Sequence, residues 1–335
     1  MVVRTAWKLV NLSILLVLLV VLMGGWTRIN DAGLSCPDWP GCYGHIVMPG
    51  SEEALQLAQQ RFPEVPIEKH KTWLEMGHRY LAGTLGLLIT ALAGCAVMKR
   101  RMPRYPIVLS FSLLVLVVVQ ALFGMWTVTL KLHPLVVTVH LMGGLLTLTL
   151  LLLLRQKLKR LNIVEAVNPG PVQRWFLLGI FLLLLQIALG GWTSSNYAGY
   201  ACTHWLSCNP GTELGLDFAA GFDPTKAIGP NYQGGQLGVE ARAAIQMVHR
   251  VGALVVLAYT LVLLWCFGRL PHLAAPVRLL ALSVVAQVAL GIANIVHALP
   301  IGLAMAHHFM AVAVLLSLLW AYDRAGLSTK EVIHG

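Results

Sequence analysis

Residues 9–27 read LVNLSILLVLLVVLMGGWT. An apolar run of about 18 to 25 residues has the length that a helix needs to cross a bilayer. Lipid offers no hydrogen-bond partner to an open backbone, so a spanning segment of this kind must be helical. The stretch therefore predicts a transmembrane helix, and it ends in the motif Gly24-Gly25-Trp26-Thr27.

Apolar runs of similar length occur along the whole chain. It has 335 residues, of which 57% are hydrophobic and 11% charged, and its mean hydropathy is +0.73. The predicted fold class is an all-α polytopic membrane protein with eight transmembrane helices. The further apolar runs are 73–97, 106–128, 135–154, 175–193, 243–267, 276–296 and 301–322.

The distribution of Lys and Arg predicts the orientation. Fifteen of the 24 basic residues fall in the segments on the side of the two termini. Because positive residues collect in cytoplasmic loops, we expect both termini to be cytoplasmic. The net charge of +10 is largely explained by this bias, so we expect no nucleic-acid partner.

An internal repeat divides the chain in two. The motif at Gly24 recurs at Gly190 with an offset of 166, and Gln120 and Gly124 recur as Gln287 and Gly291 with an offset of 167. We expect two pseudo-symmetric four-helix bundles related by an axis along the membrane normal. The predicted domains are 1–160, with the outer loop 28–72, and 161–335, with the outer loop 194–242.

Four histidines lie inside apolar runs and follow the repeat: His78 and His249 at an offset of 171, and His140 and His307 at an offset of 167. The second offset selects His307 over its neighbour His308. Each half thus carries two histidines on two helices, at a depth of roughly 8–9 Å from the outer end.

Paired imidazoles facing each other across a bundle suit axial ligation of a haem iron. A single membrane histidine more often hydrogen-bonds a neighbouring helix. Zinc or copper would need further ligands, and only Glu75 offers itself in the first half. We therefore favour His78, His140, His249 and His307 as axial ligands of haem iron.

An arginine follows the first histidine of each half. Arg79 and Arg250 are expected to be paired inside the membrane, and the propionates of a haem would suit their forked donors. The alternative for Arg79 is a helical ion pair with Glu75, four residues earlier. That alternative does not apply to Arg250, because Gln246 takes the place of the glutamate.

The exchange of Glu75 for Gln246 breaks the symmetry of the repeat. Glu75 lies three residues before His78, on the same helical face. A carboxyl group beside a bound ligand can accept or deliver a proton. We therefore predict chemistry in the first half and an electron-transfer haem in the second, although a glutamate near an interface can also simply extend its carboxylate to water.

Cys36 and Cys42 lie in the outer loop GLSCPDWPGCYG, and Cys202 and Cys208 repeat their spacing. On the oxidising side of the membrane each pair would close a small loop, stabilising it by about 2 kcal/mol. We expect two disulfide caps over the haem edges. A metal site or a redox pair is the alternative, but neither spacing is C-x-x-C.

The chain resembles the haem A synthase family of bacterial type over nearly its whole length. The resemblance is carried by GGWTRINDAGLSCPDWPGCYG, EMGHRYLAG, TVHL, MVHRVGA and AHHF. It implies oxidation of a methyl group of haem O to the formyl group of haem A for cytochrome oxidase. It also implies that His78 and His140 flank the substrate haem, that His249 and His307 ligate haem b, and that Glu75 is catalytic.

The resemblance further implies a multi-pass protein of the bacterial inner membrane with haem sites near the periplasmic face. Haem O synthase and cytochrome oxidase assembly factors would be its partners, beside an electron acceptor that the sequence does not identify. A homo-oligomer is among the open assembly states. The main alternative function is a dihaem b-type electron-transfer protein linked to quinone, and a transporter is a third reading.

Overall fold

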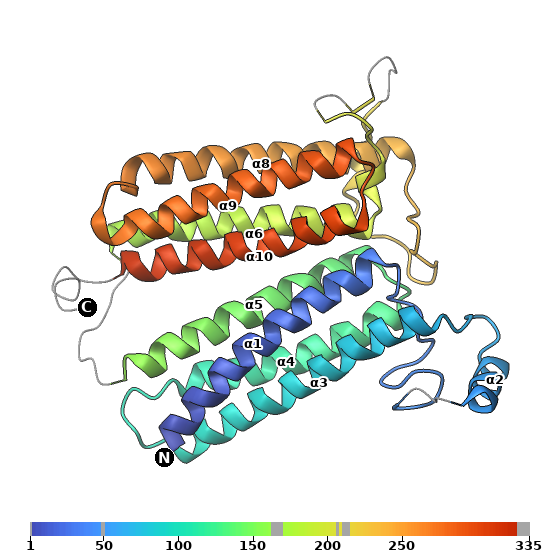
Figure 1. Ribbon diagram of the computed structural model, residues 1–335, viewed down its shortest axis with the longest axis horizontal. Helices are drawn as coiled ribbons and strands as arrows, with labels where there is room; N and C mark the ends of the chain where they lie inside the picture. Colours follow the sequence, from blue (N-terminus) through green and yellow to red (C-terminus); the bar gives the residue numbers. More distant parts are fainter. Residues whose placement is uncertain (1, 48–50, 162–169, 206–207, 210–214, 327–335) are drawn as a thin grey trace. The chain divides into compact units, whose positions relative to one another are not determined.

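The computed structural model describes residues 2–47, 51–161, 170–205, 208–209 and 215–326. Eight of the helices in this part of the chain are long and apolar enough to cross a membrane. The predicted all-α class and the eight predicted spans are confirmed. These helices are α1 (Val2–Ile29), α3 (Lys69–Met98), α4 (Ile107–Thr129), α5 (Pro134–Lys159), α6 (Pro171–Ser195), α8 (Val239–Phe267), α9 (Pro271–Val296) and α10 (Ile301–Ala325), labelled in Figure 1.

Proline marks the start of three of these helices. Pro134, Pro171 and Pro271 occupy the first turns of α5, α6 and α9, where the missing N–H has no helical partner to lose. The apolar run 276–296 lies within α9, which begins five residues earlier, so Pro276 lies inside the helix.

Three short elements in the outer loops had no apolar run to predict them: α2 (Glu52–Arg61), the 3₁₀ turn η1 (Ala198–Tyr200) and α7 (Phe218–Gly221). The start of α2 is encoded locally. The hydroxyl of Ser51 accepts a hydrogen bond from the backbone N–H of Ala54, and Glu52 and Glu53 follow in the first turn, where the helix dipole favours negative charge.

The chain forms two compact units. Unit 1 comprises Met1–Val164 and Lys226–Gln233, and unit 2 comprises Glu165–Thr225 and Gly234–Gly335. Residues 226–233 of the outer loop 194–242, which the sequence analysis assigned to the second domain, thus belong to unit 1, and the boundary between the units follows Val164 instead of residue 160. The functional division into two domains stays a prediction. The prediction that an axis along the membrane normal relates the halves stays a prediction.

In each unit the four long helices contact one another in a closed ring. In unit 1 the order around the ring is α1, α3, α4, α5, and in unit 2 it is α6, α8, α9, α10. Helices α3 and α5 thus stand at opposite corners of their bundle, as do α8 and α10. Side chains directed inward from opposite corners meet at the centre of a bundle, where cofactor sites are usually built.

The turn before the second histidine helix has the same geometry in both units. Lys131 and Leu132 have positive φ values of 47° and 59°, and Ala298 and Leu299 have values of 55° and 57°. The Leu132 N–H donates to the Thr127 carbonyl at 2.8 Å; in unit 2 the Leu299 N–H donates to the Asn294 carbonyl at 2.7 Å. Each pair keeps the offset of 167, so the repeat extends to backbone detail.

Residues 226–233 pack on this turn in unit 1. The Tyr232 N–H donates to the Lys131 carbonyl at 3.0 Å, and the buried Tyr232 ring lies 5.2 Å from the His133 ring. Nε2 of His133 lies 3.2 Å from the Lys226 carbonyl oxygen. Residues 226–233 of the outer loop 194–242 therefore cover the outer end of unit 1, whereas residues 210–214 lie outside the described residues.

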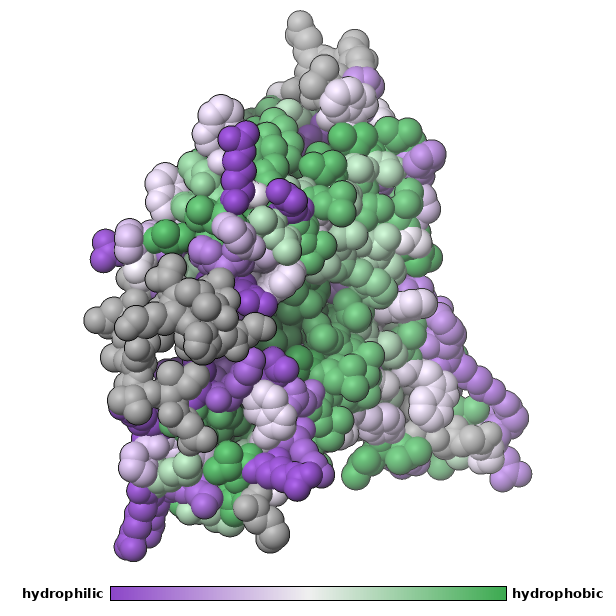
Figure 2. All heavy atoms as spheres, turned by 60° about the vertical axis from the view of Figure 1, so that its left-hand side comes forward, coloured by the Kyte–Doolittle hydropathy of each residue, from purple (hydrophilic) through white to green (hydrophobic). Residues whose placement is uncertain are grey.

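The outward faces of the long helices are apolar. Figure 2 shows hydrophobic residues, in green, covering broad areas of the helix surfaces. Large apolar side chains such as Leu87, Val108 and Trp265 are 73%, 80% and 87% exposed. Aqueous solvent does not favour so much exposed apolar area, but a lipid bilayer does.

The predicted orientation can be tested at Cys266, which is an exposed free thiol in the last turn of α8. A membrane-impermeant maleimide should label inside-out vesicles and leave right-side-out vesicles unlabelled. Cys95 is buried and should react in neither, so the Cys266→Ser variant should show no labelling. Labelling of right-side-out vesicles at Cys266 would contradict cytoplasmic termini.

Candidate haem sites

His78 and His140 meet at the centre of unit 1. They project from α3 and α5, the two helices at opposite corners, and their ring centroids are 6.4 Å apart with an interplanar angle of 85°. The Nδ1 atom of each ring is buried without a hydrogen-bond partner in the described structure. Two half-buried imidazoles that lie close together, each with a buried and unused nitrogen, could together bind a ligand.

The separation of the two rings fits an iron atom between them. Imidazole nitrogens bind metals at about 2.0–2.1 Å, so two rings sharing one metal have centroids about 6 Å apart. The observed 6.4 Å agrees with this spacing. Among the described residues no three side chains of His, Cys, Asp or Glu converge, so no larger metal cluster is present in that part of the chain.

A glycine of a neighbouring helix lies against each of the four histidines. A Cβ atom added at Gly24 would lie 3.0 Å from Cε1 of His78, closer than real contacts allow without movement. Two other pairs are similarly tight at 3.2 Å, whereas the contact of Gly124 with His140 would be an ordinary one at 3.5 Å. The absence of a side chain at the tight positions gives those imidazoles their place. The two other tight pairs are Gly190–His249 and Gly291–His307.

In unit 2 the equivalent histidines contact glutamine amides. Nε2 of Gln186 lies 3.1 Å from Nδ1 of His249 and donates to the His249 carbonyl at 2.9 Å. Nε2 of Gln287 lies 3.1 Å from Nε2 of His307. The glycine contact and the glutamine contact both involve His307 and not His308, which supports the choice made from the offset of 167.

Glu75 is buried one helical turn before His78 and is bound to the first outer loop. Its Oε2 atom accepts from the Cys36 N–H at 2.9 Å and from the Ser35 hydroxyl at 3.1 Å. Its Oε1 atom is 2.5 Å from Nη2 of Arg79. The carboxylate therefore joins α3, the disulfide loop and an arginine at one point.

Arg79 completes this clamp on the loop. Its Nη1 atom donates to the carbonyls of Asp38, at 2.8 Å, and Pro40, at 3.3 Å, and also to the carbonyl of Gly41. Both Nη atoms thus form bonds within the protein, and the helical ion pair with Glu75 considered from the sequence is present.

The first outer loop has a small core of its own. Tyr43 is fully buried and packs edge-to-face on Phe62 at 5.7 Å, and its hydroxyl donates to the carbonyls of Val65 and Pro66. Burial raises the pKa of Tyr43 to about 12, and the charge of Glu75 adds to this effect. The phenol therefore stays protonated as a donor throughout the neutral pH range.

The second outer loop is held differently. Nε2 of Gln246 donates to the Gly199 carbonyl at 3.2 Å, and Nη1 of Arg250 donates to the Trp205 carbonyl at 3.1 Å. Nε and Nη2 of Arg250 are buried without a hydrogen-bond partner among the described atoms. A half-buried guanidinium with two buried, unused donors is suited to bind an anionic group.

Each outer loop is closed by a disulfide, Cys36–Cys42 in unit 1 and Cys202–Cys208 in unit 2, with Cα–Cα distances of 4.8 and 4.4 Å. The first loop contacts α3 one turn above His78 through Glu75, so it caps the outer end of the histidine site. In unit 2, Trp192 ties α6 to α7 by donating to the Gly221 carbonyl at 2.9 Å.

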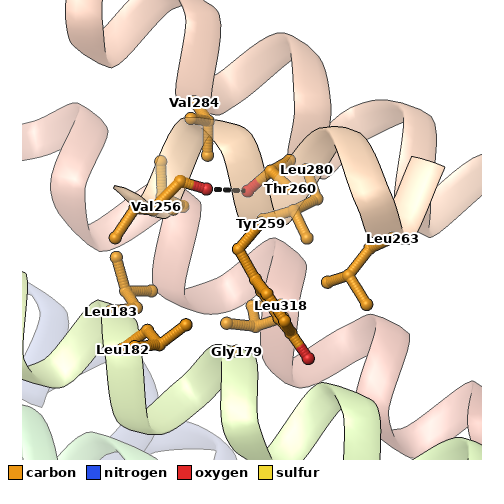
Figure 3. A pocket seen from close by; sticks show the side chains of 11 residues that line it. Gly179, Leu182, Leu183, Val256, Tyr259, Thr260, Leu263, Leu280, Val284 and Leu318 are labelled. Carbon is orange, nitrogen blue, oxygen red and sulfur yellow. Dashed lines mark hydrogen bonds between the residues drawn. The ribbon is translucent and has the colours of Figure 1, made fainter. Parts of the chain in front are cut away.

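An apolar pocket in unit 2 lies away from the histidines (Figure 3). It is lined by residues of α6, α8, α9 and α10, among them Gly179, Tyr259 and Leu318, toward the ends of the helices opposite the caps. Its only polar contact drawn is the Thr260 hydroxyl donating to the Val256 carbonyl at 2.8 Å. The lining contains no His, Cys or Met side chain that could bind a haem iron.

Sequence reasoning did not identify Ser35, Gln186 or the clamp of Arg79 on loop carbonyls. Gln186 carried a signal, because its repeat partner at an offset of 166 is Val20, a polar-for-apolar exchange inside a membrane helix. The sequence contains no comparable signal for the contacts of Arg79, because these contacts depend on how the loop folds back over α3.

The glycine contacts can be tested by adding a side chain. Gly24→Val should displace the His78 ring and lower the amount of haem bound by unit 1 by at least about tenfold, because metal sites lose affinity when a ligand is misplaced. Gly83→Val on the same bundle is the control, since a Cβ atom there meets nothing within 4 Å. Equal haem content in both variants, measured by extraction from purified protein, would refute the role of Gly24.

Comparison with known proteins shows which family this chain resembles over most of its length. Residues 7–319 match the cytochrome oxidase assembly protein family. The chain is 42% identical over 314 residues to the haem A synthase of Shewanella oneidensis, covering 92% of this chain and 93% of that protein. It is 31% identical over 327 residues to the haem A synthase of Azorhizobium caulinodans, covering 90% and 88%.

A similar match, 28% identity over 327 residues, joins it to the haem A synthase of Rhizorhabdus wittichii, with 91% and 90% of the two chains covered. All four histidines and both disulfides described above lie inside the matched residues 7–319. The chain belongs to the cytochrome oxidase assembly protein family.

Proposed function

We propose that the protein is a haem A synthase, an enzyme that oxidises a methyl group of haem O to the formyl group of haem A. The observation that carries this proposal is the opposed pair His78 and His140, at a separation that fits iron, one turn from the carboxylate of Glu75. The equivalent position of unit 2 carries the amide of Gln246 instead. Only a site that performs chemistry needs the ionisable group.

The two units would hold two haems in different roles. His78 and His140 would flank the substrate haem O, and His249 and His307 would ligate a resident haem b. Arg250 would bind a propionate of that haem through its two unused donors, whereas Arg79 stabilises the first cap. When bound, haem iron supplies the redox chemistry, while the polypeptide supplies orientation and proton handling.

Glu75 is the residue in position to handle protons. Converting a methyl to a formyl group replaces two hydrogens of the carbon by one oxygen and is a four-electron oxidation, so it requires an electron acceptor outside the described structure. Each hydrogen that leaves the carbon as a proton needs a base near it. Glu75 can accept such a proton at Oε1 or Oε2, and Ser35, Cys36 and Arg79 hold both oxygens in fixed positions. The cap that they secure would also exclude water from the outer end of the site.

The comparisons support this function over a dihaem electron-transfer protein, because the relatives described above carry the name haem A synthase. We infer a place in the bacterial inner membrane with both sites near the periplasmic face. Haem O synthase would deliver the substrate, and assembly factors of cytochrome oxidase would receive the product. A homo-oligomer is compatible with this arrangement.

The catalytic role of Glu75 is tested by Glu75→Gln, produced together with a source of haem O. Proton transfer by a positioned side chain contributes about 10²- to 10⁴-fold to a rate, so formation of haem A should fall by a factor in that range while haem O stays bound. Extracted haems are separated and quantified by chromatography. Glu52→Gln, on the exposed surface of α2, is the control. Conversion at the parent rate in Glu75→Gln would end the assignment.

The different roles of the two arginines give a second test. Arg250→Gln should lower retention of the haem in unit 2 by about 10- to 100-fold, since bonds to charged groups contribute about 1.5–3 kcal/mol. Arg79→Gln should instead loosen the first cap, and limited proteolysis should cut between residues 33 and 44 faster. Haem loss without faster cutting in Arg79→Gln would show that this arginine binds a propionate after all.

A further inference from the structure

Gln186 is a polar residue in the middle of an apolar helix, and its amide contacts a presumed haem ligand directly. The amide lies 3.1 Å from Nδ1 of His249 and also binds the backbone carbonyl of the same residue. These two contacts fix both the ring and the turn of α8 that carries it. The Oε1 atom of Gln186 is buried without a hydrogen-bond partner in the described structure.

The neighbouring helix α8 leaves space for the Gln186 amide. A Cβ atom added at Gly252 would lie only 2.1 Å from Oε1 of Gln186, so any other residue there would expel the amide. Gly252 sits three residues after His249 on the same helix. The amide and the glycine therefore form one feature on two helices.

The first half lacks both members of this pair. At the offset of 166 the partner of Gln186 is Val20, and at the offset of 171 the partner of Gly252 is Leu81. In that half Nδ1 of His78 is buried without a hydrogen-bond partner. Two coordinated differences thus distinguish histidines that otherwise share a helix position and a glycine contact.

A hydrogen bond to the second nitrogen of a ligating histidine orients the ring and strengthens its bond to a metal. A neutral imidazole that binds iron through Nε2 keeps its proton on Nδ1 and needs an acceptor there. Oε1 of Gln186 can provide that acceptor by rotation of the amide. The side chain of Val20 has no polar atom and offers none, so at this position of the first half only the backbone carbonyl of Val20 lies within hydrogen-bond reach of His78.

We propose that Gln186, admitted by Gly252, is the positioning residue that keeps the haem of the second half permanently bound, and that its absence from the first half lets the substrate porphyrin exchange. The inference rests on the proposed function, in which one haem is retained and the other enters as haem O and leaves as haem A. It assigns that difference to one amide contact.

The test is the rate at which the purified full-length protein loses haem to excess apomyoglobin. Two phases are expected, a fast one from unit 1 and a slow one from unit 2. Gln186→Val should make the slow phase about 10- to 100-fold faster, the usual cost of removing such a contact. Gln186→Glu retains an oxygen acceptor and should keep the slow phase within about threefold of the parent rate, which a purely steric role would not predict.

The matched control is Gln173→Val, a buried glutamine on the same helix about 20 Å from Gln186 along its axis. It should leave both phases unchanged. In the reciprocal variant, Val20→Gln combined with Leu81→Gly, the fast phase should slow by at least about tenfold. Thermal unfolding measured on each variant separates loss of haem from loss of fold.

His249→Ala separates the two levels of the hypothesis. If this variant keeps the slow phase, His249 is not a ligand of a retained haem and the proposed function fails at that site. If it removes the slow phase while Gln186→Val behaves like the parent protein, the ligand assignment stands and the role of Gln186 is overturned.

Discussion

The structure depends on two imidazoles meeting at the centre of a four-helix bundle inside a membrane. Such rings are costly there, because a buried polar atom without a partner destabilises a protein by about 1–3 kcal/mol. His78 and His140 carry two such atoms, and their rings are 6.4 Å apart. In the proposed function, haem iron between the rings would bind one nitrogen of each imidazole and offset part of that cost. Helices at opposite corners of the ring are the ones that bring these two side chains together at the centre of the bundle.

Small residues and tight turns set the position of these rings. Each histidine lies against a glycine of an adjacent helix, which brings the two backbones close together. At the outer end, a side chain at Gly33 would meet Leu132 at 3.1 Å, and one at Gly199 would meet Leu299 at 2.8 Å. These leucines belong to the left-handed turns that begin α5 and α10. The phase of each histidine helix is thus determined by contacts of the loop above it.

Most of this framework could be predicted from sequence, because it depends on local or periodic signals. The spans follow from apolar length, the pairing of His78 with His140 from polar residues in apolar runs, and the division into halves from a repeat with offsets of 166 to 171. The clamp of Arg79 on loop carbonyls and the packing of Tyr232 on the turn at Lys131 could not be predicted. Both depend on the path of an irregular chain segment, and no periodicity encodes that path.

The differences between the halves then follow one pattern. In unit 1 the polar groups near the histidine are directed toward the cap: Glu75 and Arg79 bind the disulfide loop, and Nδ1 of His78 has no partner. In unit 2 the corresponding groups, Gln246 and Arg250, also bond to the outer loop, but with single bonds to Gly199 and Trp205, and two donors of Arg250 stay unused. The histidine itself is contacted by the amide of Gln186. A site that admits and releases its porphyrin gains from a well-secured cap and loosely held ligands. A site that retains its porphyrin gains from tightly held ligands. The two halves could therefore acquire different roles through changes in the bonding partners of a few polar side chains.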